Sequence, residues 1–278
     1  MQADTAVEPK TYPVLSGAFL IALAVALVLV TWAVGTENYP YIHQRIVYRF
    51  PFSTLDRIYL VTLGILAAHY VAYVAHYVMV GSREGAVAAV PDLIFSPTKF
   101  VITWFFLVGL AGTYALGASI ATPALFDGAF GPARETAFLR IWNHTYFGFV
   151  LLLSLLAGAI YLTLTGIRDR GLAGAFHRAG GRLSLRPGQR FIGALNWILL
   201  VALLSNIATG VVILGATPLV AFGHLPWNAY PFENVARLAH DIGTAFIIGS
   251  ISGHIYFRLI PANQWMLKTM FAGYELKA

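Results

Sequence analysis

Cysteine is absent from the 278-residue sequence. Its absence excludes disulfide bonds, iron–sulfur clusters held by thiolates and covalently attached c-type haem, which needs a CxxCH motif. Charged residues are also scarce: they make up 11% of the chain, whereas a typical soluble domain carries about 25%. Any electron that this chain carries must therefore travel on a non-covalent cofactor, and most of its surface is expected to face something other than water.

Hydrophobic residues, by contrast, make up 58% of the chain and gather in long runs. A membrane helix needs about 20 mostly apolar residues. We expect the first run to be a retained span, because its apolar core is too long for a signal peptide and only Lys10 precedes it. We predict an all-α, polytopic transmembrane bundle with a two-span N-terminal extension (residues 1–98) and a four-helix core with a tail (99–278). The six predicted spans are 16–35, 58–80, 100–120, 139–164, 191–215 and 238–260.

The basic residues that give the net charge of +6 lie in the loops, which indicates a membrane protein rather than one that binds nucleic acid. The loop between the fourth and fifth spans is the richest in arginine. By the positive-inside rule, this loop and both termini are predicted to be cytoplasmic, in a multi-pass protein of the inner (plasma) membrane. The arginines of this loop are Arg168, Arg170, Arg178, Arg182, Arg186 and Arg190.

Histidines inside the predicted spans are the candidate functional residues. Ionisable groups within a membrane are costly and usually mark a function, and neutral imidazole is a good axial ligand for haem iron. A lone buried histidine is more often a residue that hydrogen-bonds one helix to another. The number, depth and spacing of these histidines favour the haem interpretation. They are His69, His76, His144, His240 and His254.

His240 and His254 are 14 residues apart on the last predicted span. At 100° and 1.5 Å per residue they face nearly the same way and lie about 21 Å apart along the helix. That separation suits two cofactors near opposite faces of the membrane and suits a single metal ion badly. His144 begins the fourth span on the outer side, as His240 begins the sixth. We therefore predict that these two histidines bind one iron between them.

The inner iron needs a partner for His254, and two histidines of the second span are candidates. His76 lies 19 residues from Arg57 and His254 lies 17 residues from Arg237, whereas His69 lies only 12 residues from Arg57. Depth therefore favours His76. His69 shares a face with His76 and stays open as an alternative ligand or as a residue near a quinone.

Arginines and glycines accompany the histidines at helical spacing. Arg140, Arg237 and Arg258 lie three or four residues from His144, His240 and His254, each one turn nearer water. Such arginines can bind the propionates of haem, or they are ordinary anchors at the membrane surface. Gly148 and Gly243 lie one turn from His144 and His240, where a missing side chain lets a flat macrocycle approach or serves plain helix packing.

From residue 100 onward, the sequence resembles the b-type cytochrome subunit of respiratory formate dehydrogenases and nickel–iron hydrogenases. The matching stretches are FFLVGLAG, LRIWNHTYFG, RPGQRF and ARLAHDIGTAFIIGSISGHIYF, and they lie in the last four predicted spans and their loops, in the family's order. The spacing of the two histidines on the final helix is the most specific element. The first two predicted spans have no counterpart in the family's core.

The resemblance implies a four-helix core that binds two haems b and a quinone near the cytoplasmic side. It implies that His144 and His240 ligate the outer haem, that His254 ligates the inner one, and that Gly188 and Gln189 lie near the quinone. It also implies two partners, an iron–sulfur electron-transfer subunit and a catalytic oxidoreductase subunit. Thr98 stands where the family has its remaining inner-haem histidine. Either His76 or His69 supplies that ligand, or the inner haem is absent.

The leading interpretation is a membrane-anchoring dihaem cytochrome b subunit that passes electrons between such a partner and the quinone pool, and that does not act on a substrate by itself. One alternative is a monohaem cytochrome b without the inner haem. A cofactor-free membrane anchor and a transporter or channel are alternatives of a different class. The transporter is disfavoured because no Lys or Arg lies in the middle of a span.

Overall fold

The computed structural model describes residues 12–29, 31, 54–81, 97–121, 133–182, 190–221, 231–264 and 267. The regular structure in these ranges is helical, with no strand, as the predicted all-α fold requires. Two short elements follow longer helices: a π-helical turn at Tyr77–Gly81 and a 3-10 turn, η4, at Pro261–Asn263. The longer helices are an N-terminal helix Leu15–Leu29, α2 (Thr54–His76), α3 (Pro97–Ala121), α5 (Ala133–Arg182), α6 (Arg190–Ala221) and α7 (Pro231–Leu259).

Proline sets three of the helix boundaries. α3 begins at Pro97 and α7 at Pro231, because proline at the first helical position is already in the right conformation and lacks only an N–H that would have no partner there. α7 ends before Pro261, and the residue between them, Ile260, is extended, with φ −60° and ψ 133°. A residue that precedes proline is driven to this conformation by steric contact with the proline ring.

Four helices of the described chain are long and apolar enough to cross a membrane. The crossing segments are Val61–Met79, Phe100–Ser119, Leu139–Arg168 and Phe191–Leu214. α7 is not among them, although its 29 residues would extend about 44 Å. It can be more polar because it lies inside the bundle, where Ala245, Ile247 and Tyr256 are fully buried. The membrane-protein prediction is thus supported at the level of four spans, and the count of six stays a prediction.

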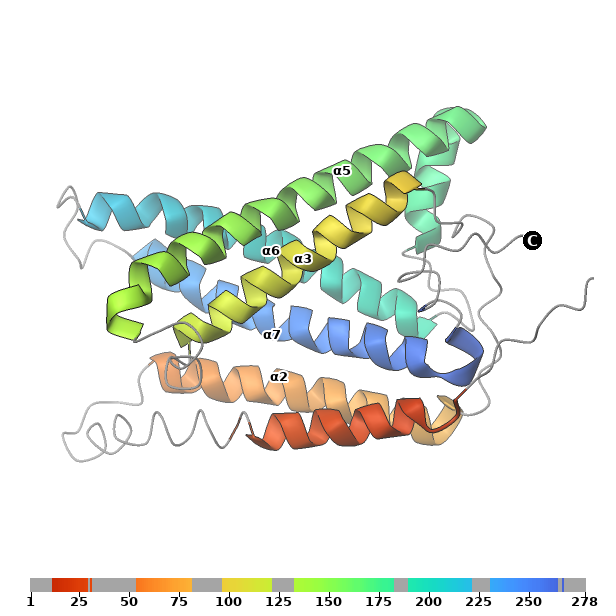
Figure 1. Cartoon of the computed structure of the whole chain (residues 1–278), viewed down its shortest axis with the longest axis horizontal. Helices are drawn as coiled ribbons and strands as arrows, with labels where there is room; N and C mark the ends of the chain where they lie inside the picture. The colour runs from red at the N-terminus through yellow and green to blue at the C-terminus, as the bar shows by residue number, and fades with distance from the viewer. Residues whose placement is uncertain are drawn as a thin grey trace, which may run out of the picture.

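α7 is the central helix of the bundle (Figure 1). α3 packs along α5, α6 packs along α7, and α2 packs on another side of α7. Contacts between the α3–α5 pair and the α6–α7 pair are sparse. α7 contributes Ile247 to a core cluster with Leu110, Leu151 and Leu203, and it contributes residues to a second cluster with α2 and the N-terminal helix. The buried residues of that second cluster are Leu20, Tyr73, Leu195, Tyr256, Phe257 and Ile260.

Glycine brings the backbones of α3 and α5 close together. A Cβ atom at Gly109 would lie 2.8 Å from the backbone nitrogen of Leu151. No side chain can occupy that space without moving one of the helices. Small residues at such contacts are the usual means of packing helices in membranes, where the lipid tails give no hydrophobic drive for association.

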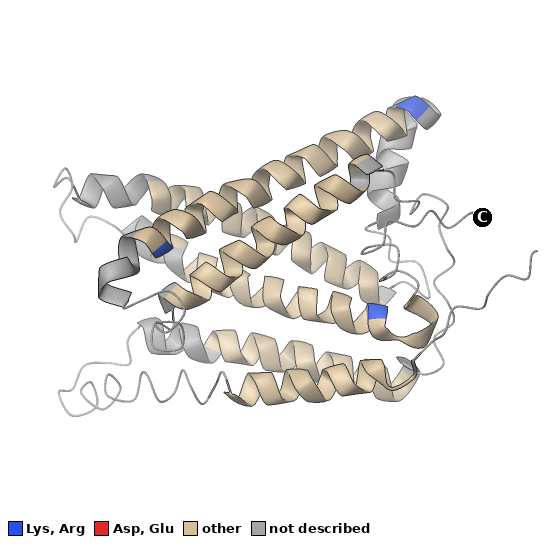
Figure 2. Cartoon of the chain, viewed as in Figure 1, with Lys and Arg blue, Asp and Glu red and all other residues tan. Residues whose placement is uncertain are grey.

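The residues just before the N-terminal helix and just after η4 are hydrogen-bonded to each other. The Tyr12 backbone N–H donates to Oε1 of Gln264 (2.9 Å), and Nε2 of Gln264 donates to the Tyr12 carbonyl oxygen (2.9 Å). Both therefore lie on the same side of the bundle. In the described part of the chain, Lys and Arg lie toward the ends of the bundle (Figure 2).

Candidate functional site

His144 on α5 and His240 on α7 lie side by side between the two helix pairs. Their ring centroids are 6.3 Å apart, and the ring planes are inclined at 79° to each other. α5 and α7 belong to different pairs, so the two rings meet across the boundary where helix-to-helix contact is sparse. The structure thus brings together the two histidines that were expected to form the outer pair.

Each of the two rings is oriented by the neighbouring helix of its own pair. Nδ1 of His144 lies 2.8 Å from the carbonyl oxygen of Thr113 on α3. Nδ1 of His240 lies 3.1 Å from the carbonyl oxygen of Asn206 on α6 and 3.1 Å from Oγ1 of Thr209. A carbonyl oxygen only accepts, so Nδ1 carries the proton in both rings. Nε2 is then left with a free lone pair, as a metal-binding histidine requires.

A glycine lies against each ring, four residues after the carbonyl that orients it. A Cβ atom at Gly117 would lie 3.2 Å from Cε1 of His144, and one at Gly210 would lie 3.5 Å from Cε1 of His240. The two segments read TYALG on α3 and NIATG on α6. The α3–α5 pair and the α6–α7 pair therefore hold their histidines by the same device: a backbone carbonyl for Nδ1 and a glycine that leaves room for the ring.

The spacing of the two rings suits histidines that would bind one metal between them. Metal–imidazole bonds are about 2 Å long, so two imidazoles that bound one metal through Nε2 would place their ring centroids roughly 6 Å apart. The described residues contain no cluster of three or more His, Cys, Asp or Glu side chains, so a fully protein-ligated zinc site, which needs three or four ligands, is not supported. Gly148 lies one turn from His144, and a Cβ atom there would meet no heavy atom within 4 Å.

Two of the other residues that were expected near the outer pair, Arg140 and Gly243, contact neighbouring helices. Arg140 is buried, with 2% of its surface exposed, and its Nη1 donates to the carbonyl oxygen of Ser119 (2.8 Å) near the end of α3. It therefore neutralises the negative end of the α3 dipole. Gly243 serves helix packing, because a Cβ atom there would collide with the side-chain oxygen of Asn206. The Arg237 side chain lies outside the described residues.

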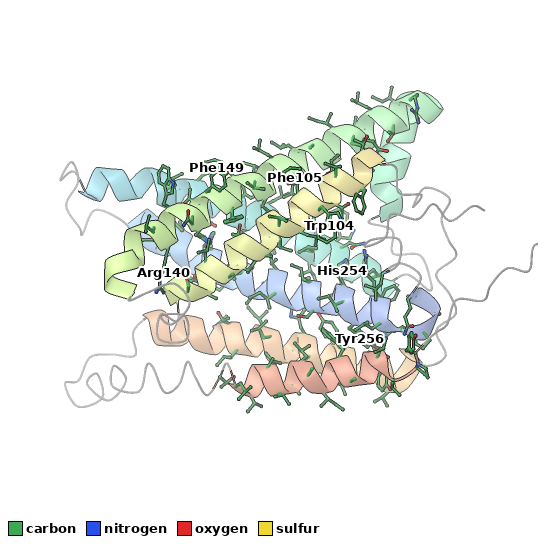
Figure 3. All side chains as sticks on the ribbon, viewed as in Figure 1. Trp104, Phe105, Arg140, Phe149, His254 and Tyr256 are labelled. Atoms are coloured by element: carbon green, nitrogen blue, oxygen red, sulfur yellow. The ribbon has the colours of Figure 1, made fainter. Side chains whose placement is uncertain are left out.

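His254 lies near the opposite end of the bundle from Arg140 (Figure 3) and has different surroundings. Its Nδ1 lies 2.8 Å from the carbonyl oxygen of Ser250, one turn earlier on its own helix. Its Nε2 lies 2.7 Å from the side-chain oxygen Oδ1 of Asn196 on α6. An amide can present either its oxygen or its NH2 group, so Asn196 is a hydrogen-bond partner for neutral and for charged imidazole. Arg258 is half-buried one turn further on.

The structure does not bring His76 or His69 to His254. Nδ1 of His76 lies 3.0 Å from the hydroxyl of Tyr256, and its ring stacks on Phe191 with centroids 4.2 Å apart. Tyr256 is two residues from His254, about 200° around the helix. Figure 3 shows Tyr256 and His254 on opposite sides of α7. Equal depth along two helices suggested a pair, but α7 itself separates His76 from His254.

His69 packs on the same α2 side of α7. A Cβ atom at Gly249 would lie 2.6 Å from Cγ of His69, so the ring lies directly against this glycine. Its Nδ1 lies 2.8 Å from the Ile65 carbonyl oxygen, and its ring meets Phe246 edge to face, with centroids 5.7 Å apart. Gly249 is about 140° around α7 from His254. Neither histidine of α2 therefore shares a site with His254.

Several residues that shape these sites were missed by sequence reasoning. Thr113 and Asn206 act through their backbone carbonyls, which any residue could supply, so residue type carried no signal. Gly117 and Gly210 could have been found from the repeated pattern of a polar residue four positions before a glycine. Asn196, one of two amides in the fifth predicted span, was another signal that the sequence offered. Gly188 and Gln189, expected near a quinone, lie outside the described residues.

Comparisons of the chain with protein-family models, with curated protein sequences and with solved structures found no match.

Proposed function

We propose that this protein is a membrane-anchoring cytochrome b subunit that passes electrons between a catalytic, iron–sulfur-containing partner and the quinone pool. The observation that carries the proposal is the relation of His144 to His240, whose ring centroids lie 6.3 Å apart between the two helix pairs. Two imidazoles with Nδ1 bonded to carbonyls and with Nε2 left to bind a metal have the tautomer and spacing of axial haem ligands.

The chain's own residues hold, orient and shield the cofactor in this proposal. His144 and His240 would bind the iron of haem b, and Thr113 and Asn206 would keep the protons of their rings on Nδ1. Gly117 and Gly210 leave room for the rings, and the apolar residues of the bundle exclude water. Haem bound at this place would supply reversible one-electron transfer.

The proposed partners follow from what the sequence lacks and resembles. Without cysteine, the chain cannot bind a thiolate-ligated iron–sulfur cluster. Electrons from a substrate would therefore arrive through a separate iron–sulfur subunit docked to a catalytic oxidoreductase subunit, as in the family that the sequence resembles. The quinone would bind near Gly188 and Gln189, in the sequence between α5 and α6.

The sharpest test is the visible spectrum of the purified protein from haem-replete cells. We expect the narrow reduced-state bands of haem with two histidine ligands in the wild type. His144→Leu and His240→Leu should each lose these bands and the bound haem, because one remaining imidazole cannot complete the ligand pair. Folding is checked by helical content and by elution as a monodisperse species in detergent.

The matched control is His69→Phe, which keeps an aromatic ring against Gly249 on the α2 side of α7. This variant should keep the haem of the wild type. A folded, colourless wild-type protein would overturn the proposal. Retention of the reduced-state bands by a folded His144→Leu or His240→Leu variant would contradict the assignment of the site.

A further inference from the structure

We infer that the inner half of this bundle binds no haem, and that His254 is a hydrogen-bonding residue that joins α7 to α6. The inference rests on the proposed function, because it concerns the number of haems that the cytochrome carries. It departs from what the sequence resemblance implies, which is a second haem held through His254.

The first reason is the direction in which the His254 ring is turned. His240 bonds to α6 through Nδ1, so its Nε2 remains available for a metal that His144 of the other helix pair would also bind. His254 is bonded the opposite way: Nδ1 meets its own helix at Ser250, and Nε2 meets α6 at Asn196. The nitrogen that would have to bind iron is therefore directed at the neighbouring helix of its own pair.

The second reason is the lack of a facing imidazole among the described histidines. His76 contacts Tyr256 of α7 and Phe191 of α6. His69 contacts Gly249 and Phe246, which lie on the side of α7 that packs against α2 or borders it. A haem ligated by either of them and by His254 would have to pass through the α7 backbone. α3, which lies on the other side, has the exposed Thr98 near its start, and a threonine hydroxyl cannot replace imidazole as a neutral nitrogen ligand.

The third reason is that both ring nitrogens of His254 are already hydrogen-bonded. Nδ1 of the imidazole bonds to the Ser250 carbonyl oxygen, and Nε2 bonds to the Asn196 side chain, which links α7 to α6. Binding iron at His254 would break the bond to Asn196 and leave its half-buried amide without that partner, which is costly in a membrane interior. A single haem is therefore the arrangement that these contacts favour.

The test measures haem per chain in the wild type and in two matched variants of the same helix, His254→Leu and His240→Leu. We expect one haem in the wild type, one haem with an unchanged reduced spectrum in His254→Leu, and none in His240→Leu. A redox titration of the wild type should follow a single one-electron curve. Asn196→Leu should behave as His254→Leu does and serves as a second variant if the histidine substitution prevents folding.

The possible outcomes separate this inference from the proposed function. Two haems in the wild type, with one lost in His254→Leu, would overturn the single-haem inference and leave the cytochrome assignment intact. No haem in the folded wild type would overturn both. One haem that is lost in His254→Leu and kept in His240→Leu would show that the inner histidine is the ligand and that the inference is wrong.

Discussion

The hydroxyl of Tyr256 on α7 lies 3.0 Å from Nδ1 of His76 on α2. Around this contact, Tyr73 stacks on Tyr256 with centroids 5.8 Å apart, and its own hydroxyl donates to the carbonyl oxygen of Gly249 (2.5 Å). The interface of α2 with α7 is thus formed by aromatic rings with hydrogen-bonded polar atoms. His76 contributes to the attachment of α2.

Tyr256→Phe should weaken this attachment and leave the haem in place. The substitution removes one buried hydrogen bond and keeps the ring, so we expect a loss of about 1 kcal/mol in stability. Thermal unfolding in detergent measures the loss, and haem content measures the second expectation. Tyr146→Phe is the matched control, because Tyr146 is exposed on α5. A Tyr256→Phe protein that lost its haem would link the α2 interface to the cofactor site.

Alanine at the two ring-facing glycines should have unequal effects. At Gly117 the new Cβ atom would lie 3.2 Å from His144, closer than ordinary van der Waals contact, whereas at Gly210 it would lie 3.5 Å from His240. Overpacking of this kind costs about 1–3 kcal/mol. We therefore expect Gly117→Ala to release haem several times faster than the wild type, as measured by transfer to apomyoglobin, and Gly210→Ala to change the rate little.

The control for both glycine substitutions is Gly64→Ala on α2, where the added Cβ atom meets no heavy atom within 4 Å. It should release haem at the wild-type rate. Equal rates in Gly117→Ala and Gly64→Ala would show that the glycine against His144 has no part in holding the ring.

Thr209→Val should raise the reduction potential of the haem without releasing it. The Thr209 hydroxyl donates to the Ser205 carbonyl oxygen (2.8 Å) and accepts from Nδ1 of His240. Hydrogen bonds from Nδ1 make the imidazole a stronger electron donor to the metal, which favours ferric iron. With the hydroxyl gone, only the Asn206 carbonyl remains as acceptor, so the ferrous state gains relative stability.

A potentiometric titration measures this shift, and Thr165→Val is its control. Thr165 is also a helical threonine bonded to a carbonyl of its own helix, at Tyr161, and no contact connects it to either histidine among the described residues. A Thr209→Val protein with a lower potential than the wild type would contradict the proposed role of the hydroxyl.

Gln264→Ala should destabilise the end of the bundle. The Gln264 side chain is 7% exposed, accepts from the Tyr12 backbone N–H, and donates to the carbonyl oxygens of Tyr12 and Leu259. Three lost hydrogen bonds correspond to about 1.5–4.5 kcal/mol. Thermal unfolding measures the loss. Thr31→Val, which removes an exposed bond within one helix, should leave the midpoint unchanged.

The order and approximate bounds of the helices could be predicted from sequence because the apolar runs are long and proline marks several boundaries. Depth could also be read by counting residues from the charged ends, which is why His144 and His240 were expected at one level. The side of a helix on which each neighbouring helix packs could not be predicted in the same way. His76 and His254 match in depth, but the side of α7 on which α2 packs depends on tertiary contacts such as Tyr73 with Gly249 and His69 with Gly249.

The orientation of the imidazole rings could not be predicted from the sequence either. His240 and His254 share a face at a spacing of 14 residues, and nothing in that spacing distinguishes them. The difference comes from which oxygen lies beside Nδ1: the Asn206 carbonyl of α6 for His240 and the Ser250 carbonyl of α7 for His254. Such a difference depends on the relative shift of two packed helices, which residue types alone do not specify.

The contact between Tyr12 and Gln264 has a practical consequence. A fluorescent or enzymatic reporter fused before the N-terminal helix and one fused after α7 should be delivered to the same compartment, whichever way the bundle is inserted. Two dyes attached beside these residues should also show efficient energy transfer in the folded protein and lose it when the first helix detaches. That signal would follow the loosening of this edge separately from the colour of any bound cofactor.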